Sequence, residues 1–387
     1  MATRKPISLL KGADNKGATW PDEPGRFTED LIDPMLQWSV KKGASDITIQ
    51  TDRPVYHELD GILYPAIFRP LDAADMAVFL SKIYGNEAQA RLASGTDLDL
   101  SYEVRPDRYT RIRFRVNITP ILSKGRDAAS ITMRVLPNEP PRMKDLNIEE
   151  DIVHHWAPRQ GIVIVTGPTG SGKTTLLAAG NRMLLERPHG CGKMLTYEAP
   201  IEYVYDAVKS PRSLVSQTEI PRHLPDFARG VRNSLRRKPE IIMVGEARDR
   251  ETISASIEAA QTGHCVYTTT HTMGVASTVQ RMISTFGTDE RAERAYALME
   301  TIRMICTQAL VPKVGGGRMG VREWMRFPDE IRERLLDMDY KEWSPNLQRW
   351  IPNYGQTMGK SAQIAFEKGL IDRRHYLLLA AATGAGG

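Results

Sequence analysis

The segment from Gly167 to Thr174 reads Gly-Pro-Thr-Gly-Ser-Gly-Lys-Thr and fits the pattern G-x-x-x-x-G-K-[ST] at every position. Glycines in such a loop let several backbone N–H groups turn toward one anion, and a following helix adds positive potential at its N-terminus. The ammonium of Lys173 suits the β- and γ-phosphates of ATP, and the hydroxyl of Thr174 suits Mg²⁺. The predicted nucleotide-binding residues here are Gly167, Thr169, Gly170, Ser171, Gly172, Lys173, Thr174 and Thr175.

Two segments that have the pattern of buried strands end in carboxylates. Ile241–Val244 is followed by Glu246, and the strand-like residues 193–197 are followed by Glu198. Ligand sites of open α/β sheets lie beyond the carboxyl ends of the strands, so both carboxylates are expected at the phosphates. Either one could activate the attacking water, and Glu246 could also hold Mg²⁺ through water. Glu246 is preferred because its strand is expected beside the phosphate-loop strand, although a solvated strand end is the simpler alternative.

Two histidines, His264 and His271, flank the strand-like segment Cys265–Thr270. A zinc site is not expected, since only one cysteine is near and no third ligand has suitable spacing. A neutral imidazole that senses the γ-phosphate is the preferred interpretation, with His271 as a catalytic candidate and His264 as a nucleotide-binding one. Ordinary structural histidines remain the alternative.

Arginines alternate along one predicted strand, at Arg111, Arg113 and Arg115. Alternate strand residues share one face, so the three guanidinium groups should project together. Like charges gathered in this way need open solvent or an anion. A solvated edge strand satisfies the first condition, and a nucleotide phosphate, including one bound to a neighbouring subunit, satisfies the second.

The periodicity of the chain changes at a proline-rich stretch. Before it, short alternating strands and helical segments predict an α+β domain, and after it apolar strands alternate with helices, as in a parallel sheet covered on both faces. Beyond residue 327 the chain is helical and charged, with a proline-containing interruption near 345–352. The expected divisions are a flexible arm (1–27), an amino-terminal domain (28–136), a linker (137–150), an ATPase domain (151–327) and a helical extension (328–387).

Bulk properties narrow the class of protein. The 387 residues carry a formal net charge of +5 and three widely spaced cysteines, which favours reduced thiols over disulfides. The sequence contains no signal-peptide core and no apolar run of the roughly 18–20 residues that span a bilayer, so a cytoplasmic protein is expected. The basic segment 229–238 lacks aromatic residues, and stable direct nucleic-acid binding is therefore not expected.

The order of the motifs resembles the type II/IV secretion ATPase superfamily, which includes PilT-like pilus motors and the traffic ATPases of type IV secretion. After the phosphate loop, 194–203 is similar to the family's Asp box, 239–249 to its Walker B segment and 259–272 to its His box. Before the loop, 43–49, 113–117 and 133–137 are similar to strands of its amino-terminal domain. Ala199 and Lys238 depart from acids common in the family, and the tail and the Asp-box wording look closest to the DotB/TraJ branch of Dot/Icm and IncI-type systems.

The resemblance implies an α/β fold with a RecA-like P-loop NTPase domain preceded by a smaller PAS-like domain. It implies a homohexameric motor with ATP between the domains, held at the inner membrane by other secretion components. ATP binding would close the domains and hydrolysis would release them, and Arg113, Arg115 and Arg134 would sense or stabilise the γ-phosphate. The alternatives are a pilus retraction motor, a nucleotide-gated assembly factor and a DNA translocase.

Overall fold

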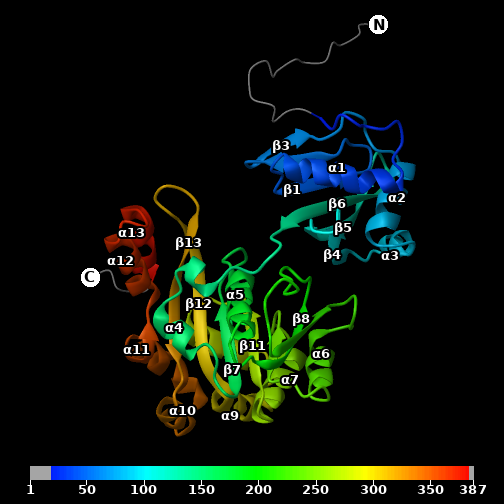
Figure 1. The fold of residues 1–387 in the computed structure, drawn as a ribbon. Coiled ribbons are helices and arrows are strands. Elements are labelled where there is room, and N and C mark those ends of the chain that lie inside the picture. Colours follow the sequence, from blue (N-terminus) through cyan, green and yellow to red (C-terminus); the bar gives the residue numbers. More distant parts are fainter. Residues whose placement is uncertain (1–18, 383–387) are drawn as a thin grey trace. The chain divides into compact units, whose positions relative to one another are not determined.

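The computed structural model describes residues 19–382, which divide into two compact units (Figure 1). The first unit extends to Asn138 and also takes in the short segment Pro200–Glu202. The second unit comprises the remaining described residues, from Glu139 onward. Each unit has its own sheet.

The first unit is built on an antiparallel sheet with strand order β3-β2-β1-β6-β5-β4. Strand β1 shows why the alternating sequence folds this way, since Ile47 and Ile49 are fully buried and their neighbours are not. Helix α2 begins at Asp72, whose carboxylate accepts the N–H of Asp75 in a capping box. The elements are α1 Glu29–Lys41, β1 Asp46–Gln50, β2 Tyr56–Leu59, β3 Ile62–Pro65, α2 Ala73–Ile83, α3 Ala88–Ala93, β4 Leu98–Val104, β5 Ile112–Ser123 and β6 Arg126–Leu136.

The prediction of a flexible arm over residues 1–27 is wrong for residues 19–27. Trp20 and Phe27 are buried in the core of the first unit, and Phe27 packs on Phe79 with ring centroids 4.9 Å apart. The carboxylate of Glu23 accepts the N–H groups of Phe68 and Arg69. Two large aromatic side chains therefore anchor a segment whose composition suggested a loose chain. Residues 1–18 of the predicted arm lie outside the described residues.

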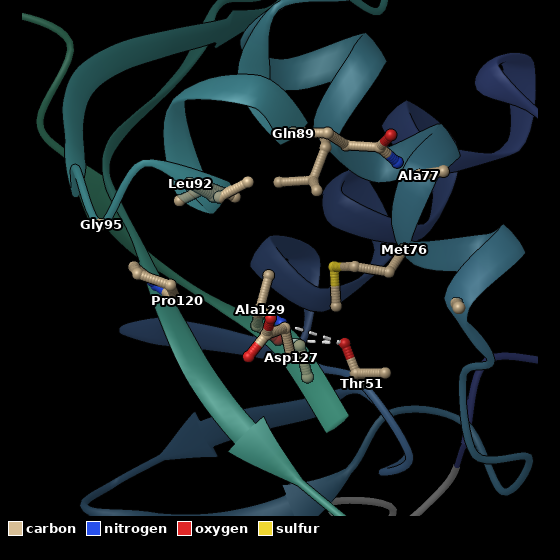
Figure 2. Close-up of a pocket in the computed structure, with 13 residues that line it drawn as sticks. Thr51, Met76, Ala77, Gln89, Leu92, Gly95, Pro120, Asp127 and Ala129 are labelled. Atoms are coloured by element: carbon tan, nitrogen blue, oxygen red, sulfur yellow. Dashed lines mark hydrogen bonds between the residues drawn. The ribbon is translucent and has the colours of Figure 1, made fainter. Parts of the chain in front are cut away.

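A cavity of about 400 Å³ lies inside the first unit, and its lining residues come from α2, α3 and the ends of β5 and β6 (Figure 2). The side chain of Met76 points into it, and the hydroxyl of Thr51 hydrogen-bonds both the N–H and the C=O of Ala129 beside it. Most of the lining is small and apolar, and its residues include none of the predicted site residues. This cavity is therefore separate from the chemistry that the motifs predict.

The sheet of the second unit has strand order β14-β13-β12-β7-β11-β10-β8-β9. The strands that were expected to form a parallel sheet, β7, β8, β10 and β11, do pair in parallel, whereas β13 pairs antiparallel with β12 and β14 antiparallel with β13. A tight turn at Gly315–Gly317 joins β12 to β13, so these two strands form a hairpin. The strands are β7 Gly161–Thr166, β8 Gly192–Glu198, β9 Ser213–Glu219, β10 Ile241–Val244, β11 Cys265–Thr270, β12 Ile302–Pro312, β13 Arg318–Arg326 and β14 Gly355–Gln356.

Helices cover both faces of this sheet, as expected. Along β7, Ile162 and Ile164 pack into the core with α7 to α11, whereas Val163 and Val165 pack into the core with α4 and α5. A strand buried on both faces is largely apolar, which explains why β7 and β10 stand out in the sequence. The helices of this part are α4 Glu150–His155, α5 Lys173–Leu185, α6 Phe227–Ser234, α7 Arg250–Gln261, α8 Val275–Ser284 and α9 Arg291–Thr301.

The carboxyl-terminal extension belongs to the second unit and is helical. A proline-containing interruption was expected near 345–352, but α11 runs through it, with Pro345 in its first turn and Pro352 in its last. Proline is tolerated near a helix start, where its missing N–H has no helical partner. The side chains of Trp343 and Trp350 on α11 are buried in the same core as Ile162 and Ile164 of β7. The elements of the extension are α10 Asp329–Leu336, α11 Trp343–Tyr354, α12 Met358–Glu367 and α13 Arg373–Ala382.

Gly180 lies inside α5, the helix that follows the phosphate loop, and a Cβ there would lie 2.2 Å from the indole ring of Trp156. Trp156 is fully buried, so it cannot move aside easily. We expect Gly180→Ala to lower the free energy of unfolding by about 1–3 kcal/mol, although alanine is the better helix former. Thermal and urea unfolding measure this change. In the double variant Gly180→Ala with Trp156→Leu, the loss of unfolding free energy should be smaller than the sum of the losses in the two single variants. Additive losses would contradict the proposed clash.

All three cysteines are free and buried. Burial raises the pKa of the Cys265 and Cys306 thiols to about 12, and it also raises the pKa of the Cys191 thiol.

Among residues 19–382, no helix is long and apolar enough to cross a bilayer.

Candidate nucleotide-binding site

The phosphate loop joins β7 to α5 and depends on its glycines. Gly167, Gly170 and Gly172 have φ values of 143°, 77° and 81°, which side-chain-bearing residues rarely adopt. A Cβ at Gly167 would also lie 2.3 Å from the carbonyl oxygen of Gln308, and one at Gly172 would lie 2.9 Å from its side-chain nitrogen. The loop therefore has both the conformation and the close packing that the motif predicts.

Lys173 is the first residue of α5, and its side chain contacts the phosphate loop. Its Nζ donates to the carbonyl oxygens of Gly167 and Pro168 at 2.8 and 3.1 Å, and it lies 3.4 Å from Nδ1 of His271. The ammonium is thus held at the loop from which phosphate-binding amides project. Thr174 and Thr175 follow in the first turn of α5, and the Thr175 hydroxyl lies 3.0 Å from the hydroxyl of Tyr203.

The remaining loop residues, Thr169 and Ser171, differ in exposure. Thr169 and the adjacent Gly170 are exposed, whereas Ser171 is buried. The carbonyl of Ser171 accepts a hydrogen bond from Nε2 of Gln308 at 2.7 Å. The exposed part of the loop is therefore open to a ligand, while its second half is fixed from beneath.

His271 connects the loop to Glu246. Its Nε2 lies 3.4 Å from Oε1 of Glu246, and its Nδ1 faces Lys173. All three belong to the carboxyl edge of the parallel strands, because Glu246 follows β10 and His271 follows β11. An ammonium, an imidazole and a carboxylate thus form one row, which suits polarisation of a water molecule beside a phosphate.

The reason given for preferring Glu246 is wrong. Its strand β10 is not adjacent to β7, since β11 lies between them. His271 follows β11, and its ring lies between Lys173 at the phosphate loop and Glu246. Glu198 lies one strand further away, at the end of β8.

Glu198 is the more enclosed of the two carboxylates. It is 4% exposed, and its Oε1 accepts hydrogen bonds from Thr196 and Gln217 at 2.6 and 3.1 Å. Burial raises the pKa of the neighbouring Tyr205 hydroxyl, and the charge of Glu198 raises it further. A carboxylate held by such contacts is more suited to organising its surroundings than to moving toward water.

The structure does not bring His264 to the loop. It precedes β11, so it lies at the opposite edge of the sheet from His271, about six residues at about 3.3 Å each along the strand. Its Nδ1 contacts the carbonyl of Ala259 at 3.0 Å and the hydroxyl of Thr262 at 3.2 Å. His264 is therefore a structural residue at the end of α7.

The arginine strand lies in the first unit, where carboxylates oppose its charges. Glu103 on β4 faces Arg113 on β5, and its Oε2 lies 3.1 Å from Nε of Arg111 and 3.9 Å from Nε of Arg113. On β6, Nε of Arg134 is 2.9 Å from Oδ1 of Asp46 on β1. The repulsion that suggested a nucleotide is thus offset within the unit, so charge alone does not assign these arginines to phosphate.

Arg115 and Arg134 nevertheless have exposed side chains, and Nη1 of Arg115 lies 3.3 Å from Oε1 of Glu202. Their side chains are 44% and 67% exposed, and the two residues face each other across β5 and β6. Arg113 is 3% exposed.

Sequence reasoning missed a set of threonine hydroxyls beside the loop. The Thr166 hydroxyl donates to the carbonyl of Thr272 at 2.5 Å and accepts from its N–H at 3.1 Å, and Thr270 donates to Thr166 at 3.0 Å. These bonds tie the segment that carries His271 to the end of β7. Threonine is common in strands, so the sequence carried only a weak signal for this role.

The chain is similar to known proteins over most of its length. The family model described as type II/IV secretion system protein matches residues 23–335. The chain is 32% identical over 344 residues to the type IV pilus retraction ATPase PilT of Pseudomonas aeruginosa, covering 89% of this chain and 96% of the relative.

Two solved structures extend the similarity to the fold. The ATPase DotB of Legionella pneumophila has a TM-score of 0.89 and 47% identity, covering 94% of this chain and 98% of the other. The pilus retraction motor PilT with bound ADP has a TM-score of 0.77 and 28% identity, covering 90% and 96%. The predicted combination of a RecA-like domain with a smaller preceding domain is confirmed. The chain belongs to the type II/IV secretion system protein family, in a DotB-like branch of its ATPases.

Proposed function

We propose that this chain is an ATP-hydrolysing motor subunit of a type IV secretion or conjugation system. The observation that carries the proposal is the row of Lys173, His271 and Glu246 beside a complete phosphate loop. A binding module would need the loop alone. The carboxylate and the imidazole add groups that turnover requires.

In the proposed reaction a water oxygen bonds to the γ-phosphorus as the bond to the β–γ bridging oxygen breaks. The bridging oxygen leaves with ADP, and the water proton passes to the carboxylate of Glu246. Lys173 and the loop amides stabilise the charge that develops on the phosphate oxygens. His271 holds Glu246 in position and senses whether the γ-phosphate is present, while Glu198 orders the neighbouring polar groups.

The residues present suit Mg²⁺, which binds hard oxygen ligands. The hydroxyl of Thr174 in the first turn of α5 and the carboxylate of Glu246 are of this kind. Bound Mg²⁺ supplies positive charge that neutralises the β- and γ-phosphate oxygens.

The secretion role is favoured over pilus retraction by the higher identity to DotB than to PilT, 47% against 32%. We propose a homohexamer that acts at the inner membrane through other secretion components. Transfer into a Pseudomonas aeruginosa strain that lacks PilT tests this choice, since restored pilus retraction would favour the retraction role.

Steady-state phosphate release by the purified protein, with and without DNA, tests the enzymatic proposal, together with mass photometry in the presence of ATP. We expect turnover that DNA does not stimulate and particles of six subunits. Tight ATP binding without turnover would identify an assembly factor instead. Stimulation by DNA of about tenfold or more would identify a translocase.

We further propose that Arg115 and Arg134 interact with the γ-phosphate during turnover; Arg113, the third arginine expected in this role, is buried beside them on β5. Arg115→Ala and Arg134→Ala should slow hydrolysis about tenfold or more while changing ADP affinity little, because ADP lacks that phosphate. Lysine at these positions should rescue only in part, since it lacks the planar fork of arginine. Turnover and ADP affinity are measured in assembled rings, with the exposed Arg126→Ala as control. Normal turnover by both alanine variants would leave these arginines as a solvated face.

A further inference from the structure

A buried arginine lies beneath the phosphate loop, and the motifs do not account for it. Arg322 on β13 is 2% exposed. Its Nε donates to Oε1 of Gln308 at 2.8 Å and its Nη1 to Oε2 of Glu149 at 3.0 Å. Nη1 and Nη2 also donate to the carbonyls of Asn147 and Leu146, both at 3.3 Å. A buried charge with this many partners is fixed in direction as well as in position.

Gln308 connects Arg322 to the phosphate loop. It lies opposite Arg322 in the β12–β13 pairing, and it is 4% exposed. A guanidinium can only donate, so the amide oxygen of Gln308 must face Arg322 and its NH₂ group must face the carbonyl of Ser171, 2.7 Å away. The arginine therefore determines which way the glutamine amide points.

The hydrogen bond to Ser171 orients a backbone amide of the phosphate loop. In a trans peptide the C=O and the following N–H point in opposite directions. Because Gln308 holds the Ser171 carbonyl toward β12, the N–H of Gly172 points away from β12. Phosphate loops bind anions through backbone N–H groups, so this peptide must be held in one orientation.

The same chain of contacts reaches the carboxyl-terminal extension. Oε1 of Glu149 accepts from Nε2 of Gln356 at 3.3 Å and from the hydroxyl of Ser361 on α12 at 3.4 Å. The Ser361 hydroxyl also accepts the backbone N–H of Arg322 at 3.0 Å. Gly320 fits this packing, since a Cβ there would lie 2.6 Å from Nη2 of Arg322.

We infer that Gln308 and Arg322 are positioning residues for the phosphate loop, and that α12 controls their alignment through Ser361 and Glu149. Displacement of α12 would move Glu149 and Arg322 and so change nucleotide affinity without touching the nucleotide. The inference rests on the proposed function in that it takes the ligand of the loop to be ATP or ADP. It gives the carboxyl-terminal helices a regulatory role in the second unit.

Gln308→Glu tests the first step. Glutamate keeps an oxygen for Arg322 but places a second oxygen, in place of the NH₂ donor, against the Ser171 carbonyl. We expect ADP affinity to fall about tenfold, the effect of one lost buried hydrogen bond, with little change in melting temperature. Amide hydrogen exchange without nucleotide should become faster in residues 168–174 and stay unchanged in β10 and β11. Gln348→Glu on α11 is exposed and adds the same charge, so it serves as the control.

The double variant Gln356→Ala with Ser361→Ala tests the coupling. It leaves the loop, Gln308 and Arg322 intact, and we expect the same pattern of loop exchange with a smaller loss of ADP affinity, about threefold. Unchanged loop exchange in this variant would overturn the role of α12. Unchanged loop exchange in Gln308→Glu, or faster exchange spread evenly over the second unit with a lower melting temperature, would overturn the positioning role. Failure of the wild-type protein to bind nucleotide would refute the proposed function instead, while exchange without nucleotide would still test the inference.

Discussion

Lys173→Ala is expected to abolish nucleotide-dependent activity in a protein that still folds. The ammonium is the only side-chain cation that the structure, within residues 19–382, places on the loop carbonyls of Gly167 and Pro168. Charge-assisted bonds to phosphate that are lost in the variant contribute about 3–4 kcal/mol, which corresponds to a 10²–10³-fold loss of rate. Phosphate release and ATP affinity measure the effect.

The control for this experiment is Lys360→Ala, which removes an exposed lysine on α12. Circular dichroism should show the same helix content and a similar melting temperature for both variants. Turnover near that of the wild-type protein by a folded Lys173→Ala variant would refute the assignment of the loop, and with it the proposed motor.

Glu246→Gln is expected to separate binding from chemistry. The amide preserves the size of the side chain and its contact with His271 but removes the negative charge that accepts the water proton. Removal of a general base typically lowers the rate about 10²–10⁴-fold, while ATP affinity should be maintained or increased. Single-turnover hydrolysis measures the chemical step, and filter binding measures the trapped ATP.

Glu198→Gln is the matched comparison, because it makes the same change one strand away. Its Oε1 accepts from Thr196 and Gln217, so we expect a lower melting temperature and a smaller loss of turnover. If Glu198→Gln proves the slower enzyme, the water-activating role belongs to Glu198.

Local patterns predicted the individual elements well. The expected strands 241–244 and 265–270 coincide with β10 and β11. Both strands lie inside the sheet and are buried at every residue, so burial determines them. Strand β9, whose sequence Ser-Leu-Val-Ser-Gln-Thr-Glu is largely polar, was not predicted, since it occupies the edge of the sheet and needs no continuous apolar face.

Relations between elements were harder to predict. The order of β7, β11 and β10 depends on how the crossovers pack, which no local pattern encodes, and the expected position of β10 beside β7 was therefore wrong. The phosphate loop was predictable because its ligands are contiguous in sequence. Gln308 and Arg322 act on it from more than 130 residues away, and each alone is an ordinary strand residue.

The burial of all three native thiols makes the chain a convenient scaffold for site-specific labelling. Thiol reagents attack the thiolate, and a thiol with a pKa of about 12, as at Cys265 and Cys306, is almost entirely protonated at neutral pH. Cys191 is enclosed as well. A cysteine introduced at an exposed position in each unit should therefore react with maleimide dyes far faster than the native ones. Pairs of dyes attached in this way would let single-molecule fluorescence follow the distance between the two units through the nucleotide cycle, in an otherwise unmodified protein.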